Sequence, residues 1–402
     1  MKILINALTA REGGGITYVR EMLPALARFG EAHEFHVLLS PEYQTGLLET
    51  LPEGIRPLIA DVAAGQLLHR WWFEQVEIPR IIRRQSFDLL FTVNEIGTVR
   101  SPCPHVMLAR NLHIHSPVPN QSTRQRLFLL WRRLSRGPTA RAALRAADRV
   151  VFVSDAFRRE VNASLALDPA KTHVVHHGVS LSFSESQNAE KDASSAGFQA
   201  LPARQYLLAV SSIDVHKNFE TLLLAYADAA RAGADSFPDL VIAGTIADRP
   251  LYDRLQNRAK SLGISESVNF VGRVPHVELA ALYHAALALV FPSRLESFGQ
   301  PLLEAMASGA PIIASALPAC REVCVDAALY FEPNDSTTLT THITAIVTSR
   351  SLRARMRALG LERARAFSWE KTATRMMAIF EDAVASRRVQ PSSQRGTREA
   401  HA

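Results

Sequence analysis

Two glutamates with seven residues between them are the side chains of this sequence best suited to chemistry. Glu296 and Glu304 lie in the stretch ESFGQPLLEAM, which follows the apolar run LALVFPS at residues 287–293. The apolar run predicts a buried strand. Pro301 and Gly309 are typical of the first turn and of the end of a helix. We therefore expect Glu296 in the loop before this helix and Glu304 one turn inside it.

The start of the predicted helix is suited to binding an anion. The first N–H groups of a helix have no partner within it, and together with Gly299 they form a favourable site for phosphate oxygens. Carboxylates repel phosphate, but they accept hydrogen bonds from hydroxyls. Two acids on either side of a phosphate site suggest a sugar on one side and a ribose on the other. The spacing alone fits equally well a solvated loop glutamate and a surface helix glutamate.

A lysine opens the second half of the chain in a similar place. Lys217 lies in the strand–loop–helix segment AVSSIDVHKNFETLLLAY, just before the predicted helix. Its ammonium group would meet the same diphosphate. The alternative is an ordinary surface charge.

Three glycines follow the first predicted strand. Gly13, Gly14 and Gly15 would let a ligand approach the backbone closely. They do not complete the dinucleotide-binding pattern G-x-G-x-x-G, because Tyr18 occupies the third glycine position. A flexible turn without a ligand is the alternative.

The elements that must position these residues come in two series. Apolar runs alternate with amphipathic runs up to residue 178 and again from residue 205, which predicts parallel sheets covered by helices. The segment between the two series is polar and weakly patterned, as linkers are. We predict an α/β protein with two Rossmann-like domains facing across a cleft, whose ligands bind at the carboxyl ends of the strands. The expected parts are an acceptor-side domain (1–180), a linker (181–203), a nucleotide-sugar-binding domain (204–367), a helix packing back on the first domain (368–386) and a disordered tail (387–402).

Composition limits the classes of function. The length of 402 residues fits two domains, and 47% hydrophobic with 21% charged residues is typical of a globular protein. A net charge of +6 is a modest excess for this length, so it does not by itself indicate nucleic-acid binding. Cys103, Cys320 and Cys324 do not form a disulfide framework, and we expect them to be small buried side chains in a reducing compartment. No run of eighteen apolar residues and no signal-peptide pattern is present, so we expect a cytoplasmic protein.

Several stretches resemble one enzyme family. The acid–seven–acid spacing within PSRLESFGQPLLEAMASGAPIIAS is its most specific signature, and ADRVVFVSDAFRREV and VVHHGVS also match. The chain resembles the retaining GT-B glycosyltransferases of family 4, also called glycosyl transferases group 1. The resemblance is strong from 205 to 380 and weaker before 110.

The resemblance implies a role for each matching residue. Glu304 would bind the ribose hydroxyls of a nucleotide, Glu296 the hydroxyls of the donor sugar, and Lys217 the diphosphate. The remaining expected contacts are the amides near Phe298, Gly299 and Gln300 with the diphosphate, the backbone at Gly272 and Arg273 with the base, and Gly14 and Gly15 with the diphosphate and the acceptor. Glu296 and Lys217 would be catalytic, since negative charge builds on the diphosphate as the anomeric bond breaks.

The sequence departs from the family pattern in two places. The family usually has an arginine ahead of or next to the lysine, where this chain has Ser211, Ser212 and His216. Many members also have a His-Asp pair after the strand at 105–109, where this chain has Arg110 and Asn111. His113 is the candidate for the catalytic imidazole, with His115 nearby, although a histidine at such a place is more often structural or exposed.

Two basic segments carry aromatic residues. Residues 69–84 contain Trp71 and Trp72 beside Arg83 and Arg84, and residues 124–149 combine eight arginines with an apolar stripe. Such mixtures can lie on an anionic bilayer, which fits a lipid-linked acceptor at the inner face of the plasma membrane. The alternative is a helix that packs its apolar face on a sheet.

The function predicted from the resemblance is transfer of a hexose from a nucleotide-diphosphate sugar to a glycan or lipid-linked acceptor in surface polysaccharide or lipopolysaccharide biosynthesis. GDP-mannose is the preferred donor, because SIDVHKN resembles the mannosyl-transferring branch. No D-x-D motif occurs, so no metal is expected to hold the phosphates, and no nucleic-acid partner is expected. One alternative is a GT-B epimerase or phosphorylase, against which the acid spacing counts. Another is a basic nucleic-acid- or NAD-binding protein, against which the incomplete glycine pattern counts.

Overall fold

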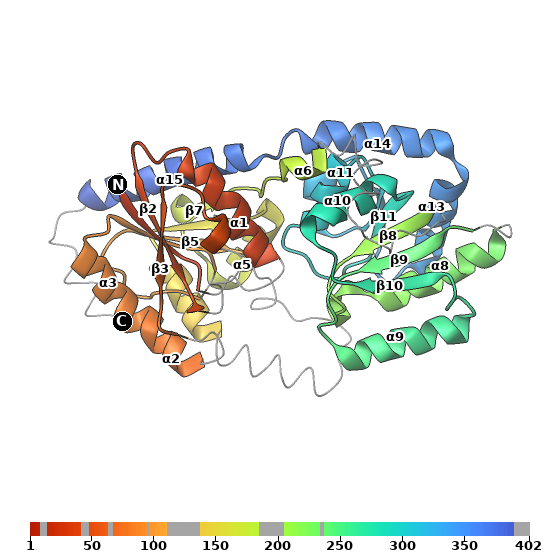
Figure 1. Ribbon diagram of the computed structural model, residues 1–402, viewed down its shortest axis with the longest axis horizontal. Coiled ribbons are helices and arrows are strands. Elements are labelled where there is room, and N and C mark those ends of the chain that lie inside the picture. Colours follow the sequence, from red (N-terminus) through yellow and green to blue (C-terminus); the bar gives the residue numbers. More distant parts are fainter. Residues whose placement is uncertain are drawn as a thin grey trace. The chain divides into compact units, whose positions relative to one another are not determined.

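The computed structural model describes residues 1–8, 14–41, 48–62, 67–94, 96–110, 137–184, 205–233 and 237–389. These residues form two compact units (Figure 1). The described residues from Met1 to Gly178 belong to the first unit, together with those from Trp369 onward. The second runs from Val179 to Ser368.

The first unit is built on a parallel sheet of seven strands in the order β3-β2-β1-β4-β5-β6-β7. Its central strands are buried along nearly their whole length, which explains why they appear in the sequence as continuous apolar runs. The strands are β1 (Lys2–Asn6), β2 (Glu34–Leu39), β3 (Ile55–Ile59), β4 (Leu89–Thr92), β5 (His105–Ala109), β6 (Arg149–Phe152) and β7 (Thr172–Val174).

Helices cover this sheet (Figure 1). Ser154 caps α5, because its hydroxyl accepts a hydrogen bond from the amide of Phe157 at 3.1 Å. The helices are α1 (Gly14–Ala27), η2 (Leu48–Thr50), α2 (Leu67–Trp72), the π-helical η3 (Phe73–Glu77), α3 (Ile78–Gln85), α5 (Asp155–Leu165), η5 (Pro169–Lys171) and α15 (Trp369–Val389).

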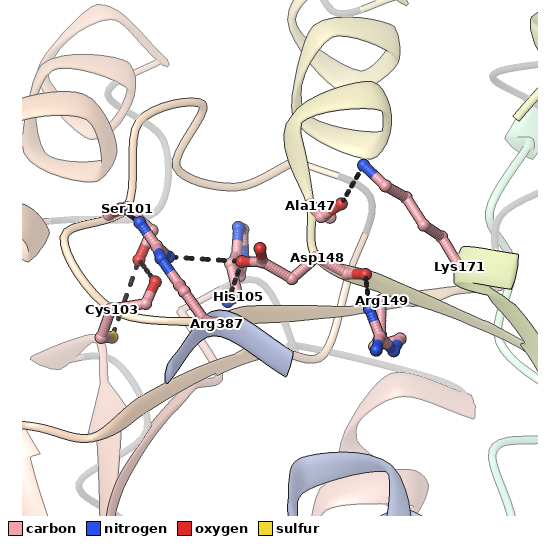
Figure 2. Close-up of polar contacts among 8 residues, drawn as sticks. All are labelled: Ser101, Cys103, His105, Ala147, Asp148, Arg149, Lys171 and Arg387. Atoms are coloured by element: carbon pink, nitrogen blue, oxygen red, sulfur yellow. Dashed lines mark hydrogen bonds and ion pairs between the residues drawn. The ribbon is translucent and has the colours of Figure 1, made fainter. Parts of the chain in front are cut away.

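Helix α15 belongs to the first unit although it ends the described chain, and it packs against α1 and β5. Arg149 Nε donates to Asp382 of this helix at 2.6 Å. Arg387 donates to the Ser101 carbonyl at 3.1 Å and lies 3.3 Å from Asp148, as Figure 2 shows. The helix thus extends three residues past 386, its predicted last residue, into the segment expected to be a disordered tail. Residues 390–402 lie outside the described part.

The second unit has a parallel sheet of six strands in the order β10-β9-β8-β11-β12-β13. Its core lies between this sheet and the helices, with Leu222 and Tyr226 of α8 fully buried against strand residues such as Ile242. The strands are β8 (Tyr206–Val210), β9 (Asp239–Ala243), β10 (Val268–Gly272), β11 (Ala288–Phe291), β12 (Ile312–Ser315) and β13 (Leu329–Phe331). The helices are α6 (Leu181–Ser184), η7 (Val215–Lys217), α8 (Phe219–Ala232), α9 (Arg249–Leu262), α10 (His276–Ala285), α11 (Gln300–Ala307), α12 (Pro318–Cys324), α13 (Ser336–Thr348) and α14 (Arg350–Ala364).

The predicted α/β class with two parallel sheets is confirmed. Edge strand β3 was not predicted, because Arg56 and Pro57 interrupt its apolar pattern. Leu181–Ser184 were predicted to belong to the linker, whereas they form α6 and bury Phe183; residues 185–203 of that linker lie outside the described part.

All three cysteines are free and buried, as expected. Among the described residues, no helix combines the length and the apolar character needed to cross a bilayer.

Candidate functional site

The carboxyl ends of β8 and β11 bring Lys217 and Glu296 together. The two strands are parallel neighbours, so the segments that follow them meet at one edge of the second unit's sheet. Lys217 ends η7, and Glu296 lies between β11 and α11. The Lys217 ammonium donates to Glu296 Oε1, and the two side chains are only 15% and 12% exposed.

The Glu296 carboxylate is held in its charged form. Burial alone would raise its pKa, but the charge and hydrogen bond of Lys217 outweigh burial and bring the pKa below its ordinary value. His216 and the Ser293 hydroxyl, which donates to Glu296 Oε1 at 3.1 Å, act in the same direction. The described pair is therefore an ion pair, in which the ammonium keeps two further N–H donors for another ligand.

Asn218 fixes the position of Lys217. It adopts a left-handed conformation (φ 58°) and is 2% exposed. Its amide donates to the carbonyls of Pro292 at 2.9 Å and Pro333 at 2.6 Å. These bonds tie η7 to the end of β11 and to the segment that follows β13.

His216, which lies in the region where the family usually has an arginine, is close to this pair. Its ring is 8% exposed, and Nδ1 lies 3.0 Å from a carboxylate oxygen of Asp214. Its carbonyl accepts a hydrogen bond from the amide of Arg294 at 2.8 Å. Ser211, where the family has an arginine, continues β8 through a hydrogen bond from its amide to the Ala243 carbonyl at 2.9 Å.

Glu304 lies in the second turn of α11 and is 5% exposed. Its Oε2 accepts a hydrogen bond from the Tyr283 hydroxyl at 3.0 Å, and its Oε1 lies 3.8 Å from His276 Nε2. Burial, followed by the charge of Glu304, raises the pKa of Tyr283 well above its ordinary value, so this hydroxyl stays a donor. Glu304 is therefore a buried, oriented carboxylate rather than a surface helix residue.

The residues at the start of α11 have different surroundings. Gly299 precedes the helix with φ +91°, and a Cβ there would lie 2.8 Å from Leu302 Cδ1, so only glycine fits without strain. Phe298 buries its ring against Phe367, with ring centroids 6.2 Å apart, so any ligand contact would come from its backbone. Gln300 is the first residue of the helix.

Gly272 and Arg273 lie at the carboxyl end of β10, before α10. Gly272 has φ +71°, and its carbonyl accepts a hydrogen bond from the Gly244 amide at 2.7 Å. Arg273 is exposed. Because α10 begins at His276, the same connection delivers the imidazole that approaches Glu304.

The remaining candidates belong to the first unit or lie outside the described residues. Gly14 and Gly15 form the first turn of α1. The part of the predicted glycine loop that the structure describes is therefore the start of a helix. A Cβ on Gly15 would lie 2.4 Å from Nη2 of Arg110, so this glycine allows the guanidinium to lie against the helix. Gly13, His113 and His115 lie outside the described part.

Sequence reasoning did not single out Tyr283, His276 or Asn218. A signal was available for the first two: His276 and Tyr283 are seven residues apart, on one side of a helix whose other residues, except Glu278 and His284, are apolar. Polar groups on the buried side of a helix need a partner. Among the described residues, no cluster of three or more metal-ligating side chains occurs.

Comparison with known proteins supplies two family matches. Residues 191–363 match the model described as Glycosyl transferases group 1, and residues 12–183 match the model described as Glycosyltransferase Family 4. The O-antigen chain mannosyltransferase B of Escherichia coli is 33% identical over 177 residues, which are 44% of this chain and 45% of that protein. D-inositol 3-phosphate glycosyltransferase 1 of Catenulispora acidiphila is 30% identical over 62% of this chain and 61% of its own length. The matches thus span about half to three fifths of these relatives.

Similarity to solved structures extends over almost the whole chain. Sucrose-phosphate synthase from Thermosynechococcus elongatus aligns with a TM-score of 0.74 at 20% identity, covering 96% of this chain and 99% of that one. At this identity the likeness concerns the fold alone, and the GT-B prediction is confirmed.

Proposed function

We propose that this chain, which belongs to the glycosyl transferases group 1 family, transfers a hexose from a nucleotide-diphosphate sugar to a glycan or lipid-linked acceptor with retention of anomeric configuration. The observation that carries the proposal is the ion pair between Lys217 and Glu296. The same unit also holds the oriented carboxylate of Glu304. A cation and two acids in buried, hydrogen-bonded positions suit a ligand with one diphosphate and two sets of hydroxyls.

Each side chain has a defined task in this proposal. Glu304 accepts hydrogen bonds from the ribose hydroxyls, with Tyr283 orienting its carboxylate. Glu296 accepts from hydroxyls of the donor sugar and holds Lys217 in place. Lys217 directs its remaining N–H donors at the diphosphate and stabilises the charge that develops on the leaving group.

Mannose is the sugar we propose, with GDP-mannose as donor. The support comes from the likeness to an O-antigen chain mannosyltransferase and from the stretch SIDVHKN around Lys217. Surface polysaccharide or lipopolysaccharide biosynthesis is the corresponding setting. No metal is assigned to the phosphates, since Lys217 and the start of α11 supply the positive electrostatic potential.

A thermal-shift panel of GDP-, UDP- and ADP-sugars tests the donor site. A ligand at a hundred times its dissociation constant stabilises the fold by about 2.7 kcal/mol, which raises the melting temperature by several degrees. We expect GDP-mannose to do this for the parent chain and for Glu266→Gln, an exposed control before β10, but not for Glu304→Ala. A panel in which no nucleotide sugar acts, or in which Glu304→Ala responds like the parent, contradicts the proposal.

Product analysis separates transfer from the alternative chemistries. Incubation with labelled donor and a glycan acceptor should give an extended glycan with the α- or β-configuration of the donor retained. Formation of an epimerised nucleotide sugar, or of a sugar 1-phosphate when inorganic phosphate is present, would instead identify an epimerase or a phosphorylase.

We also propose that the first unit contacts an anionic membrane surface, which would bring the enzyme to a lipid-linked acceptor. Leu68, Trp71 and Trp72 of α2 are 85%, 50% and 42% exposed. The Arg80 guanidinium lies 6.0 Å from the Trp72 ring centroid, and Arg83 and Arg84 of α3 are exposed. Exposed aromatic side chains next to arginines favour the interface of an anionic bilayer. Residues 124–136 of the other basic segment, at 124–149, lie outside the described part.

Vesicle sedimentation tests this contact. We expect phosphatidylglycerol vesicles to retain the parent chain, and the double variant Trp71→Ser/Trp72→Ser to be retained much less. Leu359→Ser removes an exposed apolar side chain from the second unit and should have no effect. Equal retention of both variants would exclude α2 from the contact.

A further inference from the structure

A groove of about 670 Å³ lies between α8 and α9 of the second unit, and none of the candidate donor-site residues lines it. Its walls carry three arginines, namely Arg254 and Arg258 from α9 and Arg294 from the loop after β11. Figure 1 shows the two helices side by side at the edge of this unit. A volume of this size is ordinary for a small-molecule site.

The charges around the groove are not balanced. Glu220 is the single carboxylate among the described lining residues. No described acid forms an ion pair with Arg254 or Arg258, whereas Arg249 of the same helix pairs with Asp253 at 3.0 Å. Three guanidinium groups facing one carboxylate leave an excess positive charge, which favours an anionic occupant.

Arg294 adds a partly desolvated cation to this set. It is half-buried, and burial lowers its pKa, an effect that the charge of Glu220 only partly offsets. Its Nε donates to Asn334 Oδ1, a neutral acceptor, at 3.3 Å. A guanidinium held in this way would gain from a charged acceptor in the groove.

The side chains of α9 that line the groove follow helical spacing. Arg254, Asn257, Arg258 and Ser261 occupy one helix face, because their positions differ by three and four residues. Arg254 and Arg258 are one turn apart, so both can reach the oxygens of one phosphate group, for which the guanidinium geometry is well matched.

Apart from Leu224, the rest of the lining is polar and suits hydroxyls. Asn257 and Ser261 offer donors and acceptors, and Thr221 and Glu220 face them from α8. We infer that this groove binds the phosphate group of a small hydroxyl-bearing molecule of the sugar-phosphate class, separately from the donor site. The inference does not depend on the proposed transferase activity, since it rests on side chains that the proposed reaction does not use.

Isothermal titration of the full chain with a hexose 6-phosphate tests this inference, with the unphosphorylated hexose and inorganic phosphate as comparison ligands. Ionic strength is kept constant with chloride. We expect the hexose 6-phosphate to bind more tightly than inorganic phosphate, and the free hexose not to bind. Arg254→Gln/Arg258→Gln should lose at least about ten-fold in affinity, because two charge-assisted hydrogen-bonding groups are removed. Both arginines are exposed, so this variant should fold like the parent, which its melting temperature verifies.

Two matched variants locate the binding. Arg249→Gln removes a guanidinium from the same helix outside the groove and should bind like the parent. Lys217→Met alters the candidate donor site and should also bind like the parent. If Lys217→Met abolishes binding while Arg254→Gln/Arg258→Gln leaves it intact, the ligand occupies the donor site and the inference is wrong.

Two further outcomes would also overturn it. If Arg249→Gln and the double variant lose affinity for the hexose 6-phosphate equally, the binding reflects non-specific attraction to positive charge rather than a site. Binding to phosphatidic acid vesicles that depends on Arg254 and Arg258, without any binding of the soluble phosphates, would identify a lipid headgroup surface instead of a sugar-phosphate site.

Discussion

The Tyr283 hydroxyl donates to Glu304 Oε2 over 3.0 Å in the interior of the second unit, where Tyr283 has no exposed surface. Phe183 of α6 packs edge-on against this tyrosine and against His276, with ring centroids 5.9 Å and 4.8 Å away. One oxygen of the carboxylate is therefore occupied by the protein. The other, near His276, is the one oriented toward a ligand in our proposal.

Replacing Tyr283 by phenylalanine should weaken nucleotide binding through Glu304. The change keeps the ring and its packing but removes a hydrogen bond to a charged acceptor, which is worth about 1.5 kcal/mol or more. We expect the dissociation constant of the donor nucleotide to rise about ten-fold, since 1.4 kcal/mol corresponds to a factor of ten. Calorimetry with the nucleoside diphosphate measures this.

The nucleotide lacking both ribose hydroxyls provides the control ligand for this experiment. The 2′,3′-dideoxy compound should bind Tyr283→Phe and the parent with similar affinity, because it makes no contact that Tyr283 supports. Tyr252→Phe, on α9, should leave both affinities unchanged. If both nucleotides lose affinity equally in Tyr283→Phe, the substitution acts by a general loosening of the second unit rather than through Glu304.

The Lys217–Glu296 pair predicts strongly non-additive substitutions. Lys217→Met leaves a nearly buried carboxylate without its cation and should lower the free energy of unfolding by about 2 kcal/mol or more. Lys217→Met/Glu296→Leu removes both charges and should recover much of that loss. Urea unfolding of the parent, both single variants and the double variant gives the coupling energy. Additive changes would mean that the two charges do not interact in solution.

The same pair should dominate the chemical step. Loss of a positive group that stabilises leaving-group charge typically costs about 10² to 10³ in kcat. We expect Lys217→Met to show this loss, with a smaller effect on KM. Lys217→Arg keeps the charge but changes its geometry, and should retain more activity than Lys217→Met.

Asn218 should stabilise the fold in two ways that can be measured separately, through its side-chain hydrogen bonds and through its left-handed backbone conformation. Asn218→Ala removes the amide bonds to Pro292 and Pro333 and also puts an alanine at φ 58°, so we expect a loss of about 2–3 kcal/mol in the free energy of unfolding. Asn218→Gly removes the same bonds but tolerates the left-handed backbone, so it should lose about 1 kcal/mol less. Chemical denaturation of both variants measures the difference, and identical losses would exclude a backbone contribution.

Most of the sheet strands could be predicted because each is an apolar run between turn residues, as in QYLLAVSS and DLVIAG. Strand β3 could not, because an edge strand need not bury both faces and tolerates Pro57. The positions of Lys217 and Glu296 after neighbouring strands followed from the parallel topology. The partners of Glu304 and Asn218 could not be predicted in this way, since Tyr283 and Pro333 come from other elements and only the folded chain brings them close.

His105 should make the stability of the first unit depend on pH below neutrality. It is 2% exposed, Nε2 lies 2.9 Å from the Thr92 hydroxyl, and Arg387 of α15 is nearby (Figure 2). Burial, followed by the charge of Arg387, lowers the pKa of His105 to about 3. The unfolded chain takes up a proton near pH 6.5, whereas the folded chain does not, so stability falls as the pH drops below 6.5.

The expected slope is at most about 1.4 kcal/mol per pH unit, or about 2 kcal/mol between pH 6.5 and 5. His105→Gln removes the titrating group and should flatten this part of the profile, whereas His69→Gln, at an exposed position of α2, should retain the parent slope. Urea unfolding followed at pH 5.0, 5.75 and 6.5 measures the three profiles. Arg387→Gln should change this slope little, because burial, the larger cause of the lowered pKa, remains in that variant, and Arg388→Gln serves as its exposed control. A His105→Gln profile as steep as the parent's would mean that other groups carry the pH dependence.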